Sequence, residues 1–148
     1  MCLKERITEE MKSAMRAKAS KQLATIRLLL AAIKQKEVDE RILLDDTAII
    51  GVIDKMLKQR RDSVTQYAAA GREDLASAER DEIDLLSTYM PARLSAQEIE
   101  HAIEHAIQTS GASSANDMGK VMALLKTNLS GRADMTELAK KVKQTLLG

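Results

Sequence analysis

Residues 88–98 read TYMPARLSAQE, and this stretch divides the chain into two helical parts. It holds Pro91, the only proline of the 148 residues, and a proline disfavours helical backbone in the residue before it. Shortly afterwards, Ser95 and Glu98 have the spacing of a capping box, in which a serine caps a helix start and a glutamate reaches back. The sequence therefore predicts a domain boundary at Pro91, with domains at 1–90 and 91–148.

Before Pro91, apolar residues recur at helical spacing in four segments, at about 3–18, 20–41, 45–70 and 72–90. In the second segment, Leu28, Ala31 and Ala32 widen the apolar stripe, which predicts a central position among its neighbours. Asp45 offers an N-cap for the third helix, and Gly71 offers a stop. We expect an N-terminal domain that resembles a four-helix bundle.

After Pro91, the same periodicity predicts three shorter helices, at about 95–110, 118–129 and 134–147. Gly111 ends the first and Gly131 the second, while Asp134 is the expected N-cap of the third. No β-strand pattern occurs in the sequence. The predicted fold is all-α, with a small C-terminal three-helix domain after the N-terminal one.

The composition limits the classes of function. Hydrophobic residues make up 45% and charged residues 30%, which excludes a disordered chain. Aromatic residues make up 1%, so the chain has no aromatic platform on which nucleic-acid bases could stack. The net charge is +1, but residues 118–148 carry six of the basic side chains against two acidic ones. The charge excess therefore lies in the last segment.

The N-terminus and the cysteine content suggest a compartment. MCLKERITEE contains no hydrophobic signal core, and the longest apolar run, LLLAAI at 28–33, is too short to span a bilayer. Cys2 is the only cysteine, which suits a reducing environment and which we interpret as an incidental thiol. These features predict a cytoplasmic protein with no membrane partner.

Two short motifs resemble known sites and are better explained by helix structure. HAIEH at 101–105 matches a zinc-peptidase string, but His101 and His105 lie opposite the apolar stripe of their helix and should face solvent. Gly119 and Lys120 lack the first glycine, the hydroxyl residue and the strand of a phosphate-binding loop. We therefore expect no metal, no cofactor and no catalytic residue. Arg60 and Arg61, in KQRRDS at 58–63, read as a solvated face, with an anion site as the weaker alternative.

The basic residues of the last segment form the candidate nucleic-acid site. If its two helices pair antiparallel, several cations could share one surface and contact a phosphate backbone. The alternative is that these lysines only keep exposed helix faces soluble, and charge alone does not separate the two. Gly119 lacks a structural reason near a helix start, and the approach of a neighbouring helix or a ligand would explain it. The proposed contacts are Lys120, Lys126, Arg132, Lys140, Lys141 and Lys143.

An ordered set of motifs then resembles a known family. The motifs are IRLLLAAIKQKEVDE at 26–40, KQRRDS at 58–63, GREDL at 71–75, E-x-x-E-I-x-x-L at 79–86, YMP at 89–91, GASSANDMGKVM at 111–122 and GRAD at 131–134. Together they resemble the YqeY family, small bacterial proteins homologous to the C-terminal tail of GatB. The resemblance covers nearly the whole chain and implies an all-helical protein of two parts.

The resemblance also implies a function. GatB belongs to the amidotransferase that converts mischarged Glu-tRNA or Asp-tRNA, and its tail contacts the tRNA while catalysis lies elsewhere. The positions that match are Gly119, Lys120, Gly131, Arg132, Ala133 and Asp134. Such proteins are often catalogued under carbon–nitrogen ligase activity with glutamine as amide donor. This chain lacks the parts that would catalyse it, so the label would be inherited from GatB.

Three hypotheses follow. The first is a non-catalytic module that binds tRNA or associates with an amidotransferase or an aminoacyl-tRNA synthetase. The second is a protein-interaction adaptor that uses the groove between its two helical domains and touches no RNA. The third, a small zinc peptidase, rests only on the HAIEH string.

Overall fold

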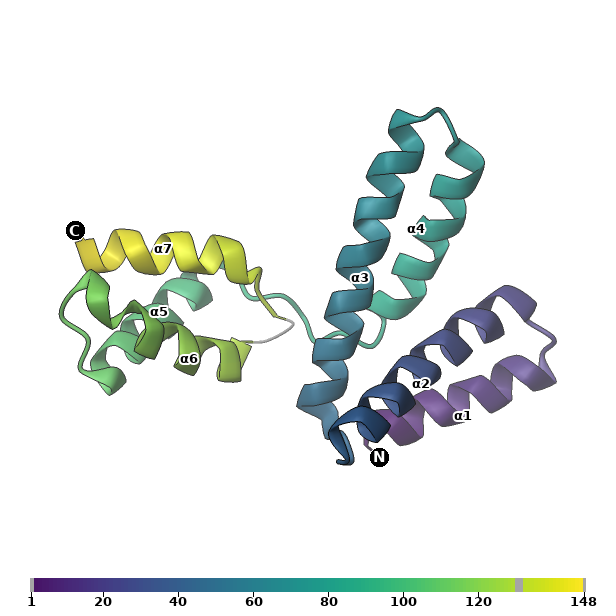
Figure 1. Cartoon of the computed structure of the whole chain (residues 1–148), viewed down its shortest axis with the longest axis horizontal. Helices are drawn as coiled ribbons and strands as arrows, with labels where there is room; N and C mark the ends of the chain where they lie inside the picture. The colour runs from purple at the N-terminus through teal and green to yellow at the C-terminus, as the bar shows by residue number, and fades with distance from the viewer. Residues whose placement is uncertain (1, 130–131, 148) are drawn as a thin grey trace. The chain divides into compact units, whose positions relative to one another are not determined.

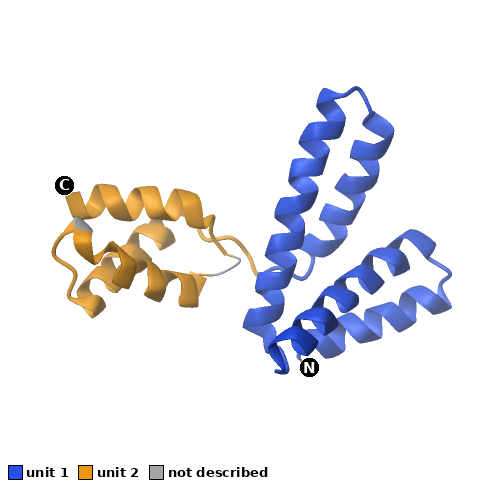
Figure 2. Ribbon diagram, viewed as in Figure 1, with its two compact units in different colours: residues 1–90 blue, residues 91–148 orange. Residues whose placement is uncertain are grey.

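The computed structural model describes residues 2–129 and 132–147, and within them the chain is all-α, which confirms the predicted fold class. No strand occurs in these ranges (Figure 1). Its contacts divide the chain into two compact units, residues 1–90 and 91–148, which we call unit 1 and unit 2 (Figure 2). The α-helices are α1 (Leu3–Arg16), α2 (Ser20–Glu40), α3 (Asp46–Ala69), α4 (Glu73–Ser87), α5 (Ala96–Ser110), α6 (Met118–Leu129) and α7 (Met135–Leu147), and a short 3₁₀ helix, η1, spans Ala115–Asp117.

Unit 1 consists of two helical hairpins, α1–α2 and α3–α4. Figure 1 shows that the hairpins meet at their open ends and diverge toward their turns. Most helix contacts therefore lie within each hairpin, unlike in a bundle whose four helices pack along their full lengths. Both α2 and α3 contact all three other helices of unit 1, so the predicted central position does not distinguish α2. The largest fully buried side chains of unit 1 are Ile7, Ile26, Leu29, Ile33, Ile49, Ile53, Leu57 and Leu86.

The helix ends of unit 1 follow the sequence signals. The carboxylate of Asp45 accepts a hydrogen bond from the backbone N–H of Ala48 at 2.8 Å and caps α3. Gly71 has a φ of +72°, a left-handed conformation that glycine adopts at little cost, and it lets the chain turn from α3 into α4.

Contacts made by Arg6 and Glu10 join α1 to the end of α4. The guanidinium carbon of Arg6 lies 5.1 Å from the centre of the Tyr89 ring, and Arg6 also donates to the carbonyl of Thr88 at 3.3 Å. The Tyr89 hydroxyl donates to the carboxylate of Glu10. Because Tyr89 is buried, this arrangement gives its phenol a partner and fixes the last turn of unit 1.

Unit 2 packs α5, α6 and α7 around a core of its own. The predicted capping box is present: Ser95 Oγ accepts from the N–H of Glu98 at 3.2 Å, and Glu98 accepts from the N–H of Ser95 at 3.5 Å. Asp134 caps α7 as predicted, accepting from the N–H of Thr136 at 2.8 Å. Gly131, the predicted stop of α6, lies outside the described residues. The core residues are Ile103, Ala106, Val121, Leu125, Leu129, Leu138 and Val142.

None of the described helices combines the length with the apolar composition that a membrane-spanning segment requires.

Candidate functional site

The two lysines of α6 are exposed but point in different directions. Lys120 lies in the first turn of the helix and Lys126 in its last turn. Because an α-helix turns by about 100° per residue, these side chains leave the helix axis about 120° apart. The apolar side chains Val121 and Leu125 face the core. The lysines therefore flank the buried stripe from both sides, as the sequence suggested, and do not form one cluster on α6.

Lys120 acts on the local electrostatics of the loop before α6. Asp117 accepts a hydrogen bond from the backbone N–H of Ser113 at 3.0 Å. This bond, with a smaller contribution from the positive charge of Lys120, holds the pKa of Asp117 below its ordinary value. The two side chains make no ion pair, so this weak attraction leaves the Lys120 ammonium available to other anions.

The three lysines of α7 separate into two sides. Lys140 and Lys143 are three residues apart and share one side of the helix, where both are exposed. Lys140 lies 3.6 Å from Glu137, and this surface ion pair is too exposed to hold either side chain firmly. Lys141 is half-buried and lines a hollow of about 320 Å³ between α5 and α7. Glu100 and Glu104 line the same hollow, so Lys141 shares it with two carboxylates of its own unit.

Arg132 has a structural task that the sequence pattern did not reveal. Its Nε donates to the carbonyl of Ala92 at 3.4 Å, and its own carbonyl accepts from the backbone N–H of Leu94 at 3.0 Å. These bonds attach the segment after Pro91 to the turn before α7. A pairing across 40 residues has no local sequence signal, which is why Arg132 was placed only as a phosphate contact.

Gly119 lies in open space. A Cβ atom built at this position would meet no described atom within 4 Å outside its own helix turn. Within the described residues of unit 2, no neighbouring helix therefore explains the glycine at this position. The glycine is exposed and accessible to a ligand.

The histidines of α5 lie as the helix periodicity predicts. His101 and His105 are both exposed, on the side away from the buried Ile103. Within the part of the chain that the structure describes, no three histidine, cysteine or carboxylate side chains are grouped as metal ligands would be.

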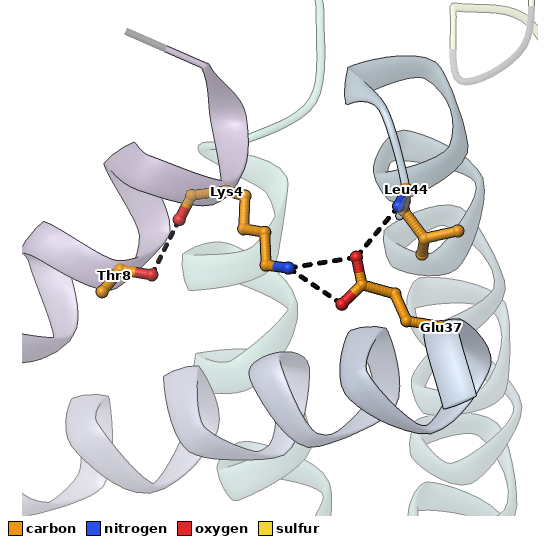
Figure 3. A network of polar contacts seen from close by, with 4 residues as sticks. All are labelled: Lys4, Thr8, Glu37 and Leu44. Atoms are coloured by element: carbon orange, nitrogen blue, oxygen red, sulfur yellow. Dashed lines mark hydrogen bonds and ion pairs between the residues drawn. The ribbon is translucent and has the colours of Figure 1, made fainter. Parts of the chain in front are cut away.

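The sequence patterns did not predict a buried carboxylate in unit 1, that of Glu37 (Figure 3). Glu37 accepts two hydrogen bonds from the Lys4 ammonium, at 2.8 and 3.0 Å, and one from the backbone N–H of Leu44 at 2.9 Å. The bonds from Lys4 and Leu44 hold the pKa of Glu37 below its ordinary value. One signal was available, because Glu37 follows Ile33 by four residues and so continues the apolar stripe of α2.

Arg60, the weaker candidate for an anion site, is already paired. Its Nε lies 2.7 Å from a carboxylate oxygen of Glu82, and its side chain is only 14% exposed. This ion pair joins α3 to α4, so Arg60 is not on a solvated face, whereas Arg61 is exposed.

Comparison with known proteins gives one family. A family model described as Yqey-like protein matches residues 4–146. Among curated proteins, several fungal relatives carry the name "Altered inheritance of mitochondria protein 41, mitochondrial". The one from Vanderwaltozyma polyspora is 37% identical over 101 residues, which cover 66% of this chain and 55% of the relative. The one from Pyrenophora tritici-repentis is 30% identical over 148 residues, or 97% of this chain and 80% of the relative.

The chain covers about half the length of the first relatives it matches. In Eremothecium gossypii, a relative with the same name is 40% identical over 87 residues, which are 58% of this chain but 48% of that protein.

These names correct the predicted location. The sequence was expected to be cytoplasmic, but its relatives are named as mitochondrial proteins. The expectation relied on a missing hydrophobic signal core and on a single cysteine. Neither feature distinguishes the cytosol from another reducing compartment, so the prediction had no physical basis for choosing between them.

Proposed function

The chain belongs to the YqeY family, and from that premise we propose that it is a non-catalytic helical module that binds tRNA through unit 2, alone or beside a tRNA amidotransferase. Three exposed lysines support this proposal most directly: Lys120, Lys126 and Lys143. Among the described residues, none of them has a carboxylate within ion-pair distance. Because chains of this composition cannot stack bases on aromatic rings, the contact would be to phosphates and to the shape of the RNA.

The geometry ranks the proposed contacts. Lys120, Lys126 and Lys143 are the strongest, followed by Lys140, whose exposed pair with Glu137 an RNA phosphate could displace. Lys141 and Arg132 are the weakest, because the first shares a hollow with two carboxylates and the second donates to the backbone carbonyl of Ala92. A side chain can contact an RNA phosphate at little free-energy cost only if it has few interactions within the protein to give up.

Filter binding of bulk tRNA to the full chain tests the proposal. We expect binding that weakens steeply between two salt concentrations, with a log–log slope of about −0.7 to −0.9 per phosphate neutralised. The triple substitution of Lys120, Lys126 and Lys143 by Glu should lower the affinity by roughly tenfold or more and reduce the slope by about 2–3. The triple substitution of Lys18, Lys21 and Lys55 by Glu is the matched control, because these are exposed lysines of unit 1 and the net charge changes by the same amount.

Two results would contradict the proposal. The first is tRNA binding that the unit 2 triple variant and the unit 1 triple variant weaken equally, since this would indicate only a general loss of positive charge. The second is the absence of salt-dependent binding in the wild-type chain.

A further inference from the structure

One side of α2 is exposed and largely apolar along nearly the whole helix. Leu28 is 50% exposed and Val38 is 59% exposed, although large apolar side chains are usually covered. We call this row the outer stripe of α2. It consists of Ala24, Leu28, Ala31, Gln35 and Val38, all of which are exposed.

The spacing of the outer stripe is that of a helix-pairing seam. Its members follow one another at intervals of four, three, four and three residues, which is the seven-residue repeat that keeps one side of a helix against a partner helix. Single apolar side chains scattered on a surface need no explanation, but a row in this register does.

The opposite side of α2 is already occupied by the core of unit 1. Ile26, Leu29 and Ile33 are buried there against the other helices. A helix that is apolar on both sides is normally covered on both. The wide apolar stripe predicted that α2 would be covered on both sides. Only one side is covered, because Leu28 and Ala31 are exposed.

The two flanks of the outer stripe carry different charge. Arg27 and Lys34, which are exposed and seven residues apart, lie along one flank. The residues at the equivalent places on the other flank are Thr25, which is buried, Ala32, which is half-buried, and Asp39, which is exposed. In paired helices the charges beside the apolar seam select the partner and its orientation. The basic flank therefore calls for acidic residues opposite it.

The surface beside the N-terminal end of the stripe extends the contact. A groove of about 450 Å³ lies between the first half of α2 and α4. Ala24 belongs both to the stripe and to this groove, and Ala78 and Leu85 of α4 supply apolar contacts on the far wall. The remaining lining residues are Lys21, Gln22, Thr25, Asp81 and Glu82.

We propose that the outer stripe of α2 binds one amphipathic helix of a partner protein, with an apolar seam of seven-residue repeat and acidic residues on the flank that meets Arg27 and Lys34. A second copy of this chain fits less well. In an antiparallel pair of copies the basic flanks would face each other. In a parallel pair Lys34 would meet Asp39, but Arg27 would lie beside Ala32, which offers no charge, so only one of the two cations would find a partner. This surface lies in unit 1 and does not depend on RNA binding by unit 2.

Two designed helical peptides of about three heptads test the proposal against the full chain by fluorescence anisotropy. Both carry leucine along the seam and alanine on one flank. On the flank that meets Arg27 and Lys34, one peptide has glutamate and the other has lysine. The glutamate peptide should bind roughly tenfold or more tightly than the lysine peptide. In the double variant Arg27→Glu, Lys34→Glu this preference should reverse.

Substitution of the stripe itself gives a second readout. Leu28→Glu should abolish binding of the glutamate peptide, while Met15→Glu should leave it unchanged, because Met15 is a comparably exposed apolar residue (48%) on α1. Equal binding of the two peptides, binding of neither, or equal effects of the two variants would overturn the proposal. Sedimentation that reveals a dimer which Leu28→Glu dissociates would assign the stripe to a second copy, and would overturn the proposed occupant.

Discussion

The Lys4 ammonium lies 2.8 Å from a carboxylate oxygen of Glu37, and this ion pair joins the start of α1 to the last turns of α2. Glu37 also accepts the backbone N–H of Leu44, whose side chain is buried in the turn that leads to α3. One carboxylate therefore holds three segments of unit 1 together (Figure 3). Such a buried acceptor should matter to stability, because its removal leaves both donors without their partner.

We expect Glu37→Gln to lower the thermal midpoint of the chain at neutral pH. Glutamine has nearly the same size and can still accept from Leu44, but it cannot neutralise Lys4. The matched control is Glu40→Gln, since Glu40 is an exposed residue three positions along the same helix. Differential scanning calorimetry that finds equal midpoints for the two variants would contradict the assigned role of Glu37.

The same carboxylate should give an acid-dependent contribution to stability. The pKa of Glu37 is lowered from its ordinary 4.5 in the folded chain, chiefly by the hydrogen bond from Lys4 and then by that from Leu44. A group of this kind stabilises the fold above its unfolded pKa and loses that effect as pH falls through the folded pKa. The wild type should therefore lose more stability than Glu37→Gln as pH falls below 4.5. Parallel stability curves from urea unfolding would show that the carboxylate is not the cause.

Tyr89 should titrate later than an ordinary phenol. Burial, the hydrogen bond to Glu10 and the negative charge of Glu10 raise its pKa above 10.0, while the nearby Arg6 opposes this shift. The chain has two tyrosines, so Tyr67→Phe leaves Tyr89 as the only phenol to follow by ultraviolet absorbance. Its midpoint should exceed pH 10, and adding Glu10→Gln should lower it. A midpoint at or below pH 10 in chains that circular dichroism shows to be folded would refute the arrangement. Because the raised pKa belongs to the folded state, the stability it contributes is complete below pH 10 and declines as pH rises further.

Arg60 and Glu82 should couple more strongly than a surface pair. Their atoms are 2.7 Å apart, and their side chains are 14% and 29% exposed, so solvent screens them only in part. A double-mutant cycle with alanine at both positions should give a coupling free energy of about 1 kcal/mol. The Lys12–Glu9 pair on α1, at 3.4 Å and more than half exposed, is the comparison and should give about 0.5 kcal/mol or less. Equal coupling in the two cycles would show that Arg60 is in effect solvated.

Local signals in the sequence predicted most of the fold. The caps at Asp45, Ser95 and Asp134 and the turn at Gly71 depend on residues within a few positions of one another, and each is present. Helix periodicity likewise placed the core stripes and the exposed histidines of α5.

What the sequence could not predict depends on distant pairs. Arg132 was placed as a phosphate contact, but the turn it occupies is bonded to the segment at Ala92, which is 40 residues away. Arg60 on α3 donates a hydrogen bond to Glu82 on α4, a residue 22 positions away in the sequence. Lys141 looked equivalent to Lys140 and Lys143 until the hollow with Glu100 and Glu104 set it apart. The number of charges along a sequence does not show which cations already have partners within the folded protein.

At Gly119, one substitution tests the effect on stability and the effect on tRNA binding separately. A Cβ atom there would meet nothing within 4 Å outside its own helix turn, so Gly119→Ala should stabilise the chain by about 0.5 kcal/mol and at most about 1 kcal/mol, through higher helix propensity. Gly51→Ala is the control, because a Cβ atom there also meets nothing within 4 Å and the residue lies in the interior of α3. It should stabilise by about 1 kcal/mol without affecting tRNA binding. If a ligand approaches the backbone at Gly119, the alanine should raise stability and weaken tRNA binding in the same protein. Urea unfolding and filter binding on both variants measure the two effects. A stabilised Gly119→Ala variant with unchanged tRNA affinity would remove Gly119 from the proposed site. A destabilised variant would contradict the finding that a Cβ atom at this position meets no neighbouring atom.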